Sequence, residues 1–415
     1  MRLDKKPRRW PWIVVILMLL GIIAALGYGY WSKLQAESHL PVFDGSNDGI
    51  SHVEDIPVAP PSVEDELQYE LYSAMEMGEF SLSEAHVDLM HAFMHLWYQP
   101  LSRFAEPDLD ELFTKEEDAL RHEAALRTLI AIRQNALTDL RMPYVDYTLT
   151  VTDVEDEDGY LRVEATETTT MRFAATPDTD SVLYDLPHIF IFDSRGESLK
   201  LYHHEADDNP YFSFTYEEGS GYDAAFHRIL RAITRRHLLR EETDTVTLTA
   251  DHPYDRDAAY AYLMAYCAER NPAWYAYDDV GGNCMNFGSQ VLLAGGIPMD
   301  EEGDEEWYWD GQNDLDLSWI NVGNFYDYCR KNEGFGLVAD TEASYYTGEV
   351  GDVLIVGFNG DHRHTTIISH VVTDEAGNTV DYLISCNTTN YKDFPASAYY
   401  YTFHRLIKIY GWNEG

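Results

Sequence analysis

Residues 281–296 read Gly-Gly-Asn-Cys-Met-Asn-Phe-Gly-Ser-Gln-Val-Leu-Leu-Ala-Gly-Gly, which sets one cysteine, Cys284, at the start of a short apolar segment. Apolar residues recur in this segment at helical spacing. The flanking glycines suit a tight turn before a helix and a left-handed residue after it. We therefore expect Cys284 in or just before a first helical turn, where free amides and the helix dipole stabilise a thiolate nucleophile. The alternative is a packed thiol, because free cysteine also behaves as a small hydrophobe.

A histidine and an asparagine follow in later strand-like segments. His364 opens the run His-Thr-Thr-Ile-Ile, and Asn387 comes near the end of Leu-Ile-Ser-Cys-Asn-Thr. A thiolate nucleophile needs an imidazole that holds its proton and later passes it to the leaving amine. The imidazole in turn needs a partner that fixes its tautomer. The order Cys284, His364, Asn387 predicts a cysteine hydrolase site, with a water molecule as the alternative third member.

Short motifs surround these three residues in a recognisable order. In chain order they are Tyr254-Asp255-Arg256, Asn271-Pro272, Cys284 to Gln290, Gly295 to Pro298, Ser318-Trp319, Gly351-Asp352-Val353, His364 to Ile367 and Asn387-Thr388. Over about residues 252–413, this series resembles the putative amidase domain of bacterial surface proteins, a family of papain-like and NlpC/P60-like cysteine hydrolases.

The resemblance implies a papain-like α+β fold that hydrolyses an amide through a thioester, without a cofactor. Its catalytic residues would be Cys284 as nucleophile, His364 as base and then acid, and Asn387 as the group that orients the imidazole. The family usually reads Asp-Cys-Thr-Asn-Phe-Val-Ser-Gln around the cysteine, where this chain differs at positions 283, 285 and 288, and usually has histidine at position 387. The alternative function is therefore an inactive, surface-tethered binding or scaffold module of the same fold.

The N-terminal segment predicts a membrane anchor. Basic residues precede an uncharged stretch over residues 12–30, which is about long enough to cross a bilayer as a helix. Aromatic residues stand at both ends of this stretch, as at membrane interfaces. We expect residues 1–36 to form a cytoplasmic tail and an uncleaved transmembrane helix, with the remainder outside the cell. A cleaved signal peptide is the rival interpretation, although its apolar core is normally only about 7–15 residues long.

Charge and cysteine content narrow the class of protein. The formal net charge of the 415-residue chain is −43, which excludes a general nucleic-acid binder because phosphate would be repelled. Four cysteines in a chain of this size are too few for a disulfide scaffold. We expect Cys267, Cys329 and Cys386 to be packed, or two of them to be paired.

The rest of the chain divides by composition. Residues 37–61 are rich in proline and glycine and predict a flexible stalk. Residues 62–215 predict a small spacer domain of helices followed by an antiparallel sheet, residues 216–251 an exposed connecting helix, and residues 252–415 the hydrolase domain. The expected helices of the spacer domain are 62–77, 83–98 and 115–140, and its expected strands are 147–151, 160–168, 170–174, 188–192 and 199–203.

The histidines near His364 allow a less favoured interpretation, in which this segment binds a metal ion. His362, His364 and His370 share strand parity, and a zinc ion there would make Cys284 a ligand instead of a nucleophile. On helix 83–98, we expect His86, His91 and His95 to be exposed or hydrogen-bonded within the protein. Taken together, the sequence predicts a membrane-anchored extracellular amide hydrolase without a metal, whose substrate would be a peptide near the cell wall, with peptidoglycan stems as the first candidate.

Overall fold

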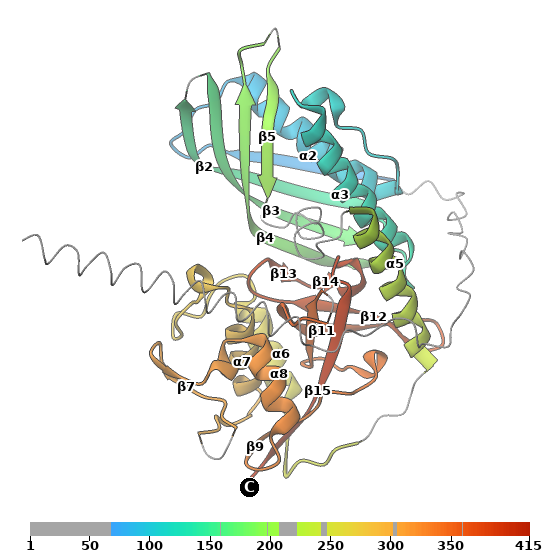
Figure 1. Ribbon diagram of the computed structural model, residues 1–415, viewed down its shortest axis with the longest axis vertical. Helices are drawn as coiled ribbons and strands as arrows, with labels where there is room; N and C mark the ends of the chain where they lie inside the picture. Colours follow the sequence, from blue (N-terminus) through green and yellow to red (C-terminus); the bar gives the residue numbers. More distant parts are fainter. Residues whose placement is uncertain are drawn as a thin grey trace, which may run out of the picture. The chain divides into compact units, whose positions relative to one another are not determined.

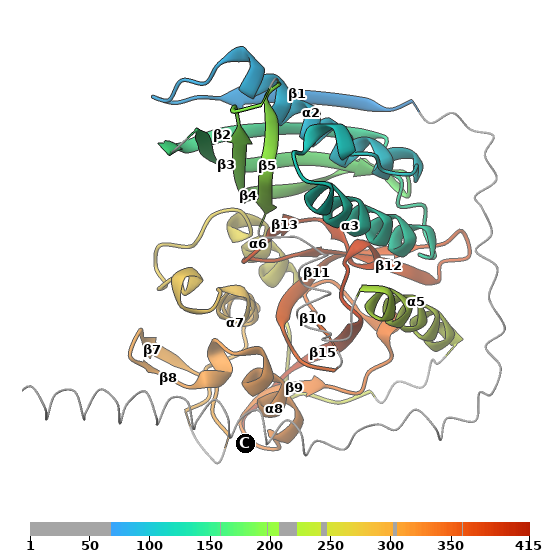
Figure 2. The same ribbon diagram turned by 45° about the horizontal axis from the view of Figure 1, so that its top comes forward.

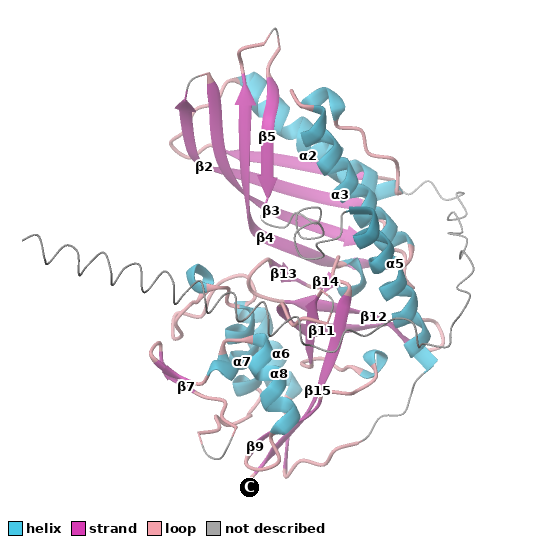
Figure 3. Ribbon diagram, in the orientation of Figure 1, coloured by secondary structure: helices cyan, strands magenta, loops and turns pink. Residues whose placement is uncertain are grey.

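The computed structural model describes residues 68–415 apart from 158, 197, 207–221, 242–246, 302–304 and 359. The predicted anchor (1–36) and stalk (37–61) lie outside the described residues. Within the described part, no helix has the length and apolar character needed to cross a bilayer. The expected α+β class is confirmed, since helices pack on two mixed or antiparallel sheets (Figure 3).

A strongly curved sheet makes up the first half of the described chain (Figure 1). Its strands are β1 (Glu70–Glu76), β2 (Tyr144–Glu157), β3 (Tyr160–Phe173), β4 (Thr176–Asp193) and β5 (Lys200–Ala206). Strands β2 to β5 form the predicted antiparallel meander, whereas β1 pairs parallel to β2. The expected helix 62–77 is therefore wrong over residues 70–76, because pairing along β2 outweighs a local preference for helix.

Two helices cover one face of this sheet (Figure 2). They are α2 (Glu84–Arg103) and α3 (Glu116–Gln134), joined through a short 3-10 turn, η1 (Asp110–Leu112), and both confirm helices expected from the sequence. Along β3 every second residue from Val163 to Phe173 is buried, as expected for a strand with one face toward the core. Glu167 interrupts this apolar face and is only 2% exposed.

The second sheet runs β14-β12-β11-β10-β15-β6, with β9 also paired to β15. Its strands are β6 (His252–Pro253), β9 (Gly336–Asp340), β10 (Val353–Gly357), β11 (His364–Thr373), β12 (Thr379–Ser385), β14 (Phe394–Pro395) and β15 (Phe403–Asn413). A separate hairpin joins β7 (Trp309–Gly311) and β8 (Asp314–Leu315). Three helices, α6 (Arg256–Tyr266), α7 (Cys284–Ala294) and α8 (Val322–Lys331), lie on one side of the sheet (Figures 1 and 2).

Each face of the second sheet belongs to a different core. Val353, Ile355 and Ile367 pack with α6, α7 and α8. Their neighbours Leu354 and Ile368 pack instead into the core of the first sheet. Because side chains alternate along a strand, β10 and β11 divide the amidase-like helices from the first half of the chain, and this division decides where the side chains of the site can point.

Direct pairing joins the two halves. Strand β13 (Asn390–Lys392) follows the second sheet in sequence but pairs antiparallel with residues 182–184 of β4, so it extends the first sheet. The Ser181 hydroxyl also donates to the Asp393 carbonyl at 2.6 Å. The predicted boundary between spacer and hydrolase domains is thus crossed by one sheet and one continuous hydrophobic core.

Helix α5 (Tyr222–Leu238) lies on the side of the second sheet opposite α7 (Figure 2). A connecting helix was expected over this segment and is present over residues 222–238, but its expected exposure is wrong for one face. Ile229 and Ile233, one turn apart, are buried in the first core, and Arg236 lies 3.0 Å from the His404 ring. Short 3-10 helices also occur, among them η2 (Leu239–Glu241), η5 (Tyr345–Thr347) and η6 (Ala396–Ala398).

Candidate functional site

Cys284 is the first residue of α7, as the sequence predicts. Its side chain is largely covered, with 9% of the residue exposed. Burial raises the pKa of the Cys284 thiol, while backbone hydrogen bonds from Thr365, Met285 and Cys284 itself act in the opposite direction. These backbone groups favour a thiolate, but desolvation outweighs them, so the net shift of the thiol pKa is upward.

A network of asparagines fixes the turn before Cys284. The Asn283 side chain donates to Asn387 Oδ1 at 2.9 Å and accepts from Asn286 Nδ2 at 2.8 Å and from the Tyr277 amide at 3.1 Å. The Asn283 amide donates to the Thr388 hydroxyl at 2.7 Å. Asn283 is 2% exposed, so these bonds satisfy a buried amide group and hold the entry to α7 in one conformation.

Trp319, at the end of η4 (Leu317–Trp319), extends this network. Its indole N–H donates to Asn286 Oδ1 at 3.0 Å, while the ring packs against Trp274 and Trp307 with centroids 5.4 Å and 4.7 Å away. From the sequence, Trp319 was only part of the Ser318-Trp319 motif, and this polar role was not predicted. The three-residue spacing of Asn283 and Asn286 on one helix face is the signal that could have revealed it.

Asn387 does not orient an imidazole in this structure. Its Nδ2 donates to the carbonyls of Tyr266 and Cys267 at 3.2 Å and 3.0 Å, and its Oδ1 accepts from Asn283. These partners lie at the end of α6 and before α7. The predicted role toward His364 is therefore corrected: Asn387 ties the end of α6 to the loop before the cysteine.

Asn387→Ala is expected to lower the free energy of unfolding by about 1–3 kcal/mol, because it leaves the buried Nδ2 of Asn283 and two carbonyls without their partner. Urea denaturation of the variant measures this change. Asn313→Ala removes an exposed asparagine and serves as the matched control. Equal midpoints for the two variants would contradict the bridging role assigned to Asn387.

His364 is the first residue of β11 and is 6% exposed. Its ring lies parallel to Tyr399 at a centroid separation of 6.2 Å, and its Nε2 is buried without a hydrogen-bond partner. Burial lowers the pKa of His364 to about 4. The imidazole is therefore neutral at pH 7 and has an unused nitrogen.

The structure brings the two segments together but places their side chains on different faces of β11. Thr365 contacts α7, with its hydroxyl 3.4 Å from Met285 Sδ and its amide at the Cys284 thiol. His364, one residue earlier, turns to the opposite face and meets Tyr399. Among the residues that the structure describes, no hydrogen bond joins Cys284 to His364.

The other two histidines of the proposed metal set have separate environments. The His362 ring packs on Tyr326 at a centroid distance of 4.4 Å. His370 pairs with Asp393 at 3.3 Å, and its pKa is raised chiefly by this hydrogen bond. Zinc needs its ligands to converge on one point, and these partners give no support to a zinc site with Cys284.

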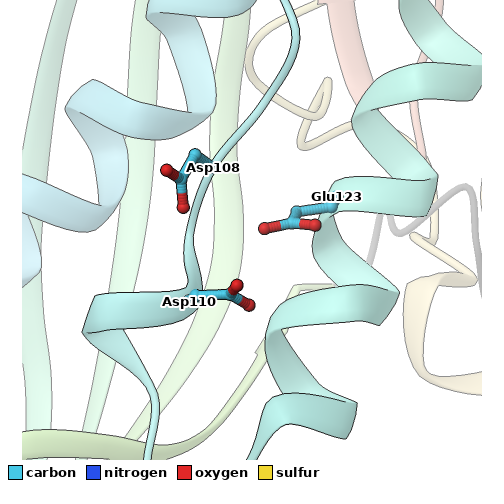
Figure 4. Close-up of side chains that lie close together, drawn as sticks. All are labelled: Asp108, Asp110 and Glu123. Carbon is cyan, nitrogen blue, oxygen red and sulfur yellow. The ribbon is translucent and has the colours of Figure 1, made fainter.

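Elsewhere in the described chain, one group of carboxylates has oxygens within 4.8 Å of one another, namely Asp108, Asp110 and Glu123 (Figure 4). Glu123 accepts from the Leu109 amide at 2.9 Å and from Arg127 at 3.2 Å. These bonds explain why the Glu123 side chain reaches this position without any ion.

The expected histidines of α2 are hydrogen-bonded within the protein. His86 Nδ1 lies 2.6 Å from the Ser83 hydroxyl, and His91 Nδ1 lies 2.8 Å from the Tyr147 hydroxyl. The four cysteines are free and buried, so the alternative of a disulfide between two of them is not seen. Cys386 faces the first core, and burial raises the pKa of its thiol to about 12.

With this geometry in view, comparison with known proteins shows what the C-terminal part of the chain is similar to. Residues 253–411 match the family described as "Putative amidase domain". This amidase domain includes α6, α7 and most of the second sheet, with Cys284 and His364 inside the match. The family description supports an amide hydrolase in general terms.

Two curated relatives of the chain are known from Bacillus subtilis (strain 168). The uncharacterized protein YhbB is 37% identical over 128 residues, which is 30% of this chain and 39% of YhbB. The uncharacterized protein YjcM is 33% identical over 108 residues, which is 26% of this chain and 24% of YjcM. The chain therefore matches less than half the length of either relative. No solved structure matches it significantly.

Proposed function

We propose that the amidase domain is a cysteine-dependent amide hydrolase with Cys284 as its nucleophile. The observation that carries this proposal is the position of Cys284 as the first residue of α7, where the backbone N–H groups of the first helical turn are free. These N–H groups would stabilise a thiolate before attack and the oxyanion during it. The match to the putative amidase domain agrees with this chemistry.

The chemical steps are those of covalent acyl transfer. The thiolate adds to the substrate carbonyl, the C–N bond breaks as the amine leaves with a proton, and water then releases the acid from the thioester. His364 is the candidate that takes the thiol proton and returns it to the amine. Its neutral imidazole has the capacity to do so, and its neighbour Thr365 contacts Met285, the residue after Cys284.

The proposal requires a local rearrangement at the start of β11. The His364 ring must leave Tyr399 and reach the face of the sheet that carries α7. Residues 361–364 would therefore have to rotate when substrate binds, so that the His364 side chain changes from one face of the sheet to the other. As the ring moves, the thiolate and the imidazolium would form an ion pair, and water would leave the site. Asn387 supports the loop before Cys284 and has no part in proton transfer.

We also propose that the protein is anchored in the cell membrane and that its substrate is a cell-wall peptide. The basic residues before position 12 and the uncharged stretch 12–30 support a single-pass anchor with a cytoplasmic N-terminus. The amidase domain would then face the cell wall, where peptide stems of peptidoglycan offer amide bonds.

A second candidate function is a binding or scaffold module without turnover. It is favoured by the His364 ring on the opposite face of β11 and by the raised thiol pKa of Cys284. In that case the buried thiol is a packing residue, and the fold presents a surface to a partner.

Thiol labelling separates these candidates. Intact protein is treated with iodoacetamide between pH 6 and 9 in the presence of a synthetic peptidoglycan stem peptide, and each cysteine is followed by peptide mapping. We expect Cys284 to react far faster than Cys329, which is 5% exposed and serves as an internal control. His364→Ala should slow the labelling of Cys284 by about 10²-fold, the usual contribution of a general base.

Hydrolysis of the stem peptide, followed as new amino groups, gives the second readout. It should vanish in Cys284→Ala and persist in Cys329→Ala. His362→Ala, in the turn before β11, is the matched control for His364→Ala. Labelling of Cys284 at the rate of Cys329, with no effect of His364→Ala, would assign the domain to the scaffold class.

A further inference from the structure

A cavity lies between α2, α3 and the inner face of β3, β4 and β5, and residues 391–400 of the amidase domain also line it. The centres of water-sized molecules can occupy about 70 Å³ inside it, which is room for several water molecules or one small ring compound. Most of its lining is aromatic or aliphatic, and it includes Phe93, Trp97, Leu129, Met171, Phe394 and Tyr400. Cys284 and His364 do not line it, although Tyr399, which does, packs against the His364 ring.

Buried polar side chains in the wall of this cavity are linked into one series of hydrogen bonds. Glu167 accepts from the hydroxyls of Tyr98 and Thr169 and lies 2.8 Å from His188 Nε2. His188 Nδ1 lies 3.0 Å from His204 Nε2. Although burial opposes ionisation, hydrogen bonds from His188 and the hydroxyls lower the pKa of Glu167. The series thus ends at the ring of His204 on β5.

Among the described residues that line the cavity, two buried ring nitrogens have no hydrogen-bond partner. They are Nδ1 of His204 and Nδ1 of His122, which belong to residues 5% and 4% exposed. The two rings lie 5.1 Å apart between centroids. Burial lowers the pKa of His122 to about 4 and that of His204 well below the usual value, so both rings are neutral.

The tautomer of His204 follows from the series of hydrogen bonds that ends at its ring. Because the Glu167 carboxylate accepts from Nε2–H of His188, Nδ1 of a neutral His188 accepts from Nε2–H of His204, and Nδ1 of His204 then carries a lone pair. Nδ1 of His122 is likewise an acceptor in one of the two neutral tautomers. An acceptor buried without a donor destabilises the folded state, so a native cavity that retains one needs an explanation.

We propose that this cavity binds an uncharged small molecule with an apolar ring or chain and a hydroxyl or N–H group that donates to Nδ1 of His122 or His204. The aromatic lining would cover the apolar part of the ligand, and the imidazoles would fix its polar end. A few polar groups in a largely apolar cavity is the usual composition of such sites. The competing explanation is that water molecules alone fill the cavity.

The test uses two probes that differ in one donor. 2-Naphthol and 2-methoxynaphthalene are titrated into the full chain at pH 7 by calorimetry. We expect one 2-naphthol to bind per chain, about tenfold more tightly than 2-methoxynaphthalene, which is the value of one neutral hydrogen bond. His122→Phe keeps a ring among Phe93 and Phe113, and either this variant or His204→Phe should remove the preference.

Several variants make the result decisive. His95→Gln, an exposed histidine of α2, should keep the preference for the donor. Ala398→Leu places a larger side chain in the lining and should remove binding of both probes. Cys284→Ser should leave probe binding unchanged, so failure of the amidase proposal and failure of this one are distinguishable. The proposal is overturned by non-saturable binding, by equal affinities of the two probes, or by a preference that survives both His122→Phe and His204→Phe.

Discussion

Replacement of Arg256 by methionine is expected to lower the free energy of unfolding by about 3–5 kcal/mol, the cost of leaving a buried charge without its partner. Arg256 lies 2.9 Å from Asp352, which is fully buried. The guanidinium also donates to the carbonyls of Val350 and Ile409, both at 2.7 Å. Methionine keeps the length of the side chain but provides none of these donors.

The loss should depend on pH. Burial raises the pKa of Asp352 from its usual 3.8 to about 6, although Arg256 acts to lower it. Between these two values the folded protein binds a proton that the unfolded chain does not, so stability falls as the pH rises through this window. Without Arg256 the folded pKa rises further. The variant should therefore lose more stability relative to the wild type at pH 8 than at pH 5.

Urea denaturation at pH 5 and pH 8 measures both effects. Arg330→Met is the matched control, because Arg330 and Asp327 form a pair at 3.5 Å in which both side chains are 52% exposed. Such exposed pairs contribute only about 0–1 kcal/mol. A destabilisation of Arg256→Met as small as that of the control, or one that is larger at pH 5, would contradict this account of Asp352.

Trp319→Ala is expected to destabilise the protein by about 3–5 kcal/mol, as is usual when a buried tryptophan is truncated. Trp319 is fully buried between Trp274 and Trp307. The change also removes the donor to Asn286 Oδ1, and Asn286 holds Asn283 in front of the cysteine. We therefore expect faster alkylation of Cys284 together with a lower unfolding midpoint.

Trp319→Phe separates the two contributions. It keeps most of the ring contacts but leaves Asn286 Oδ1 without its donor, at a cost of about 1–3 kcal/mol. Thermal unfolding and site-resolved labelling of Cys284 are the measurements. If Trp319→Ala and Trp319→Phe give the same loss of stability, packing of the indole contributes less than the buried geometry indicates.

Local pattern predicted much of the fold. The spacing of apolar residues was enough to place helices at 83–98 and 115–140, the meander that follows, and Cys284 at the start of a helix. It failed at residues 70–76, where the strand depends on β2 more than seventy positions away in the register Glu70 to Tyr144. The local pattern predicted the helix α5 but not the burial of one of its faces, because burial of Ile229 depends on a core formed by other segments.

At the candidate site, too, local sequence predicted some features, whereas others depend on distant segments. Cys284 was located by residues beside it in the chain, and the structure brings the start of β11 to it. The face on which His364 projects could not be predicted, because it depends on the register of β11 against β10, where His364 pairs with Val356. The partners of Asn387 could not be predicted either, since they come from the end of α6.

The pairing of β13 with β4 has a consequence for how such a chain can change over time. A fragment cut at residue 252 would uncover the edge of β4 on one piece and the apolar side chains of Tyr391 and Phe394 on the other. Exposed strand edges and apolar patches promote aggregation. We therefore expect recombination that exchanges one half alone to yield aggregation-prone chains, unless the substitutions at this interface are matched on both sides of it.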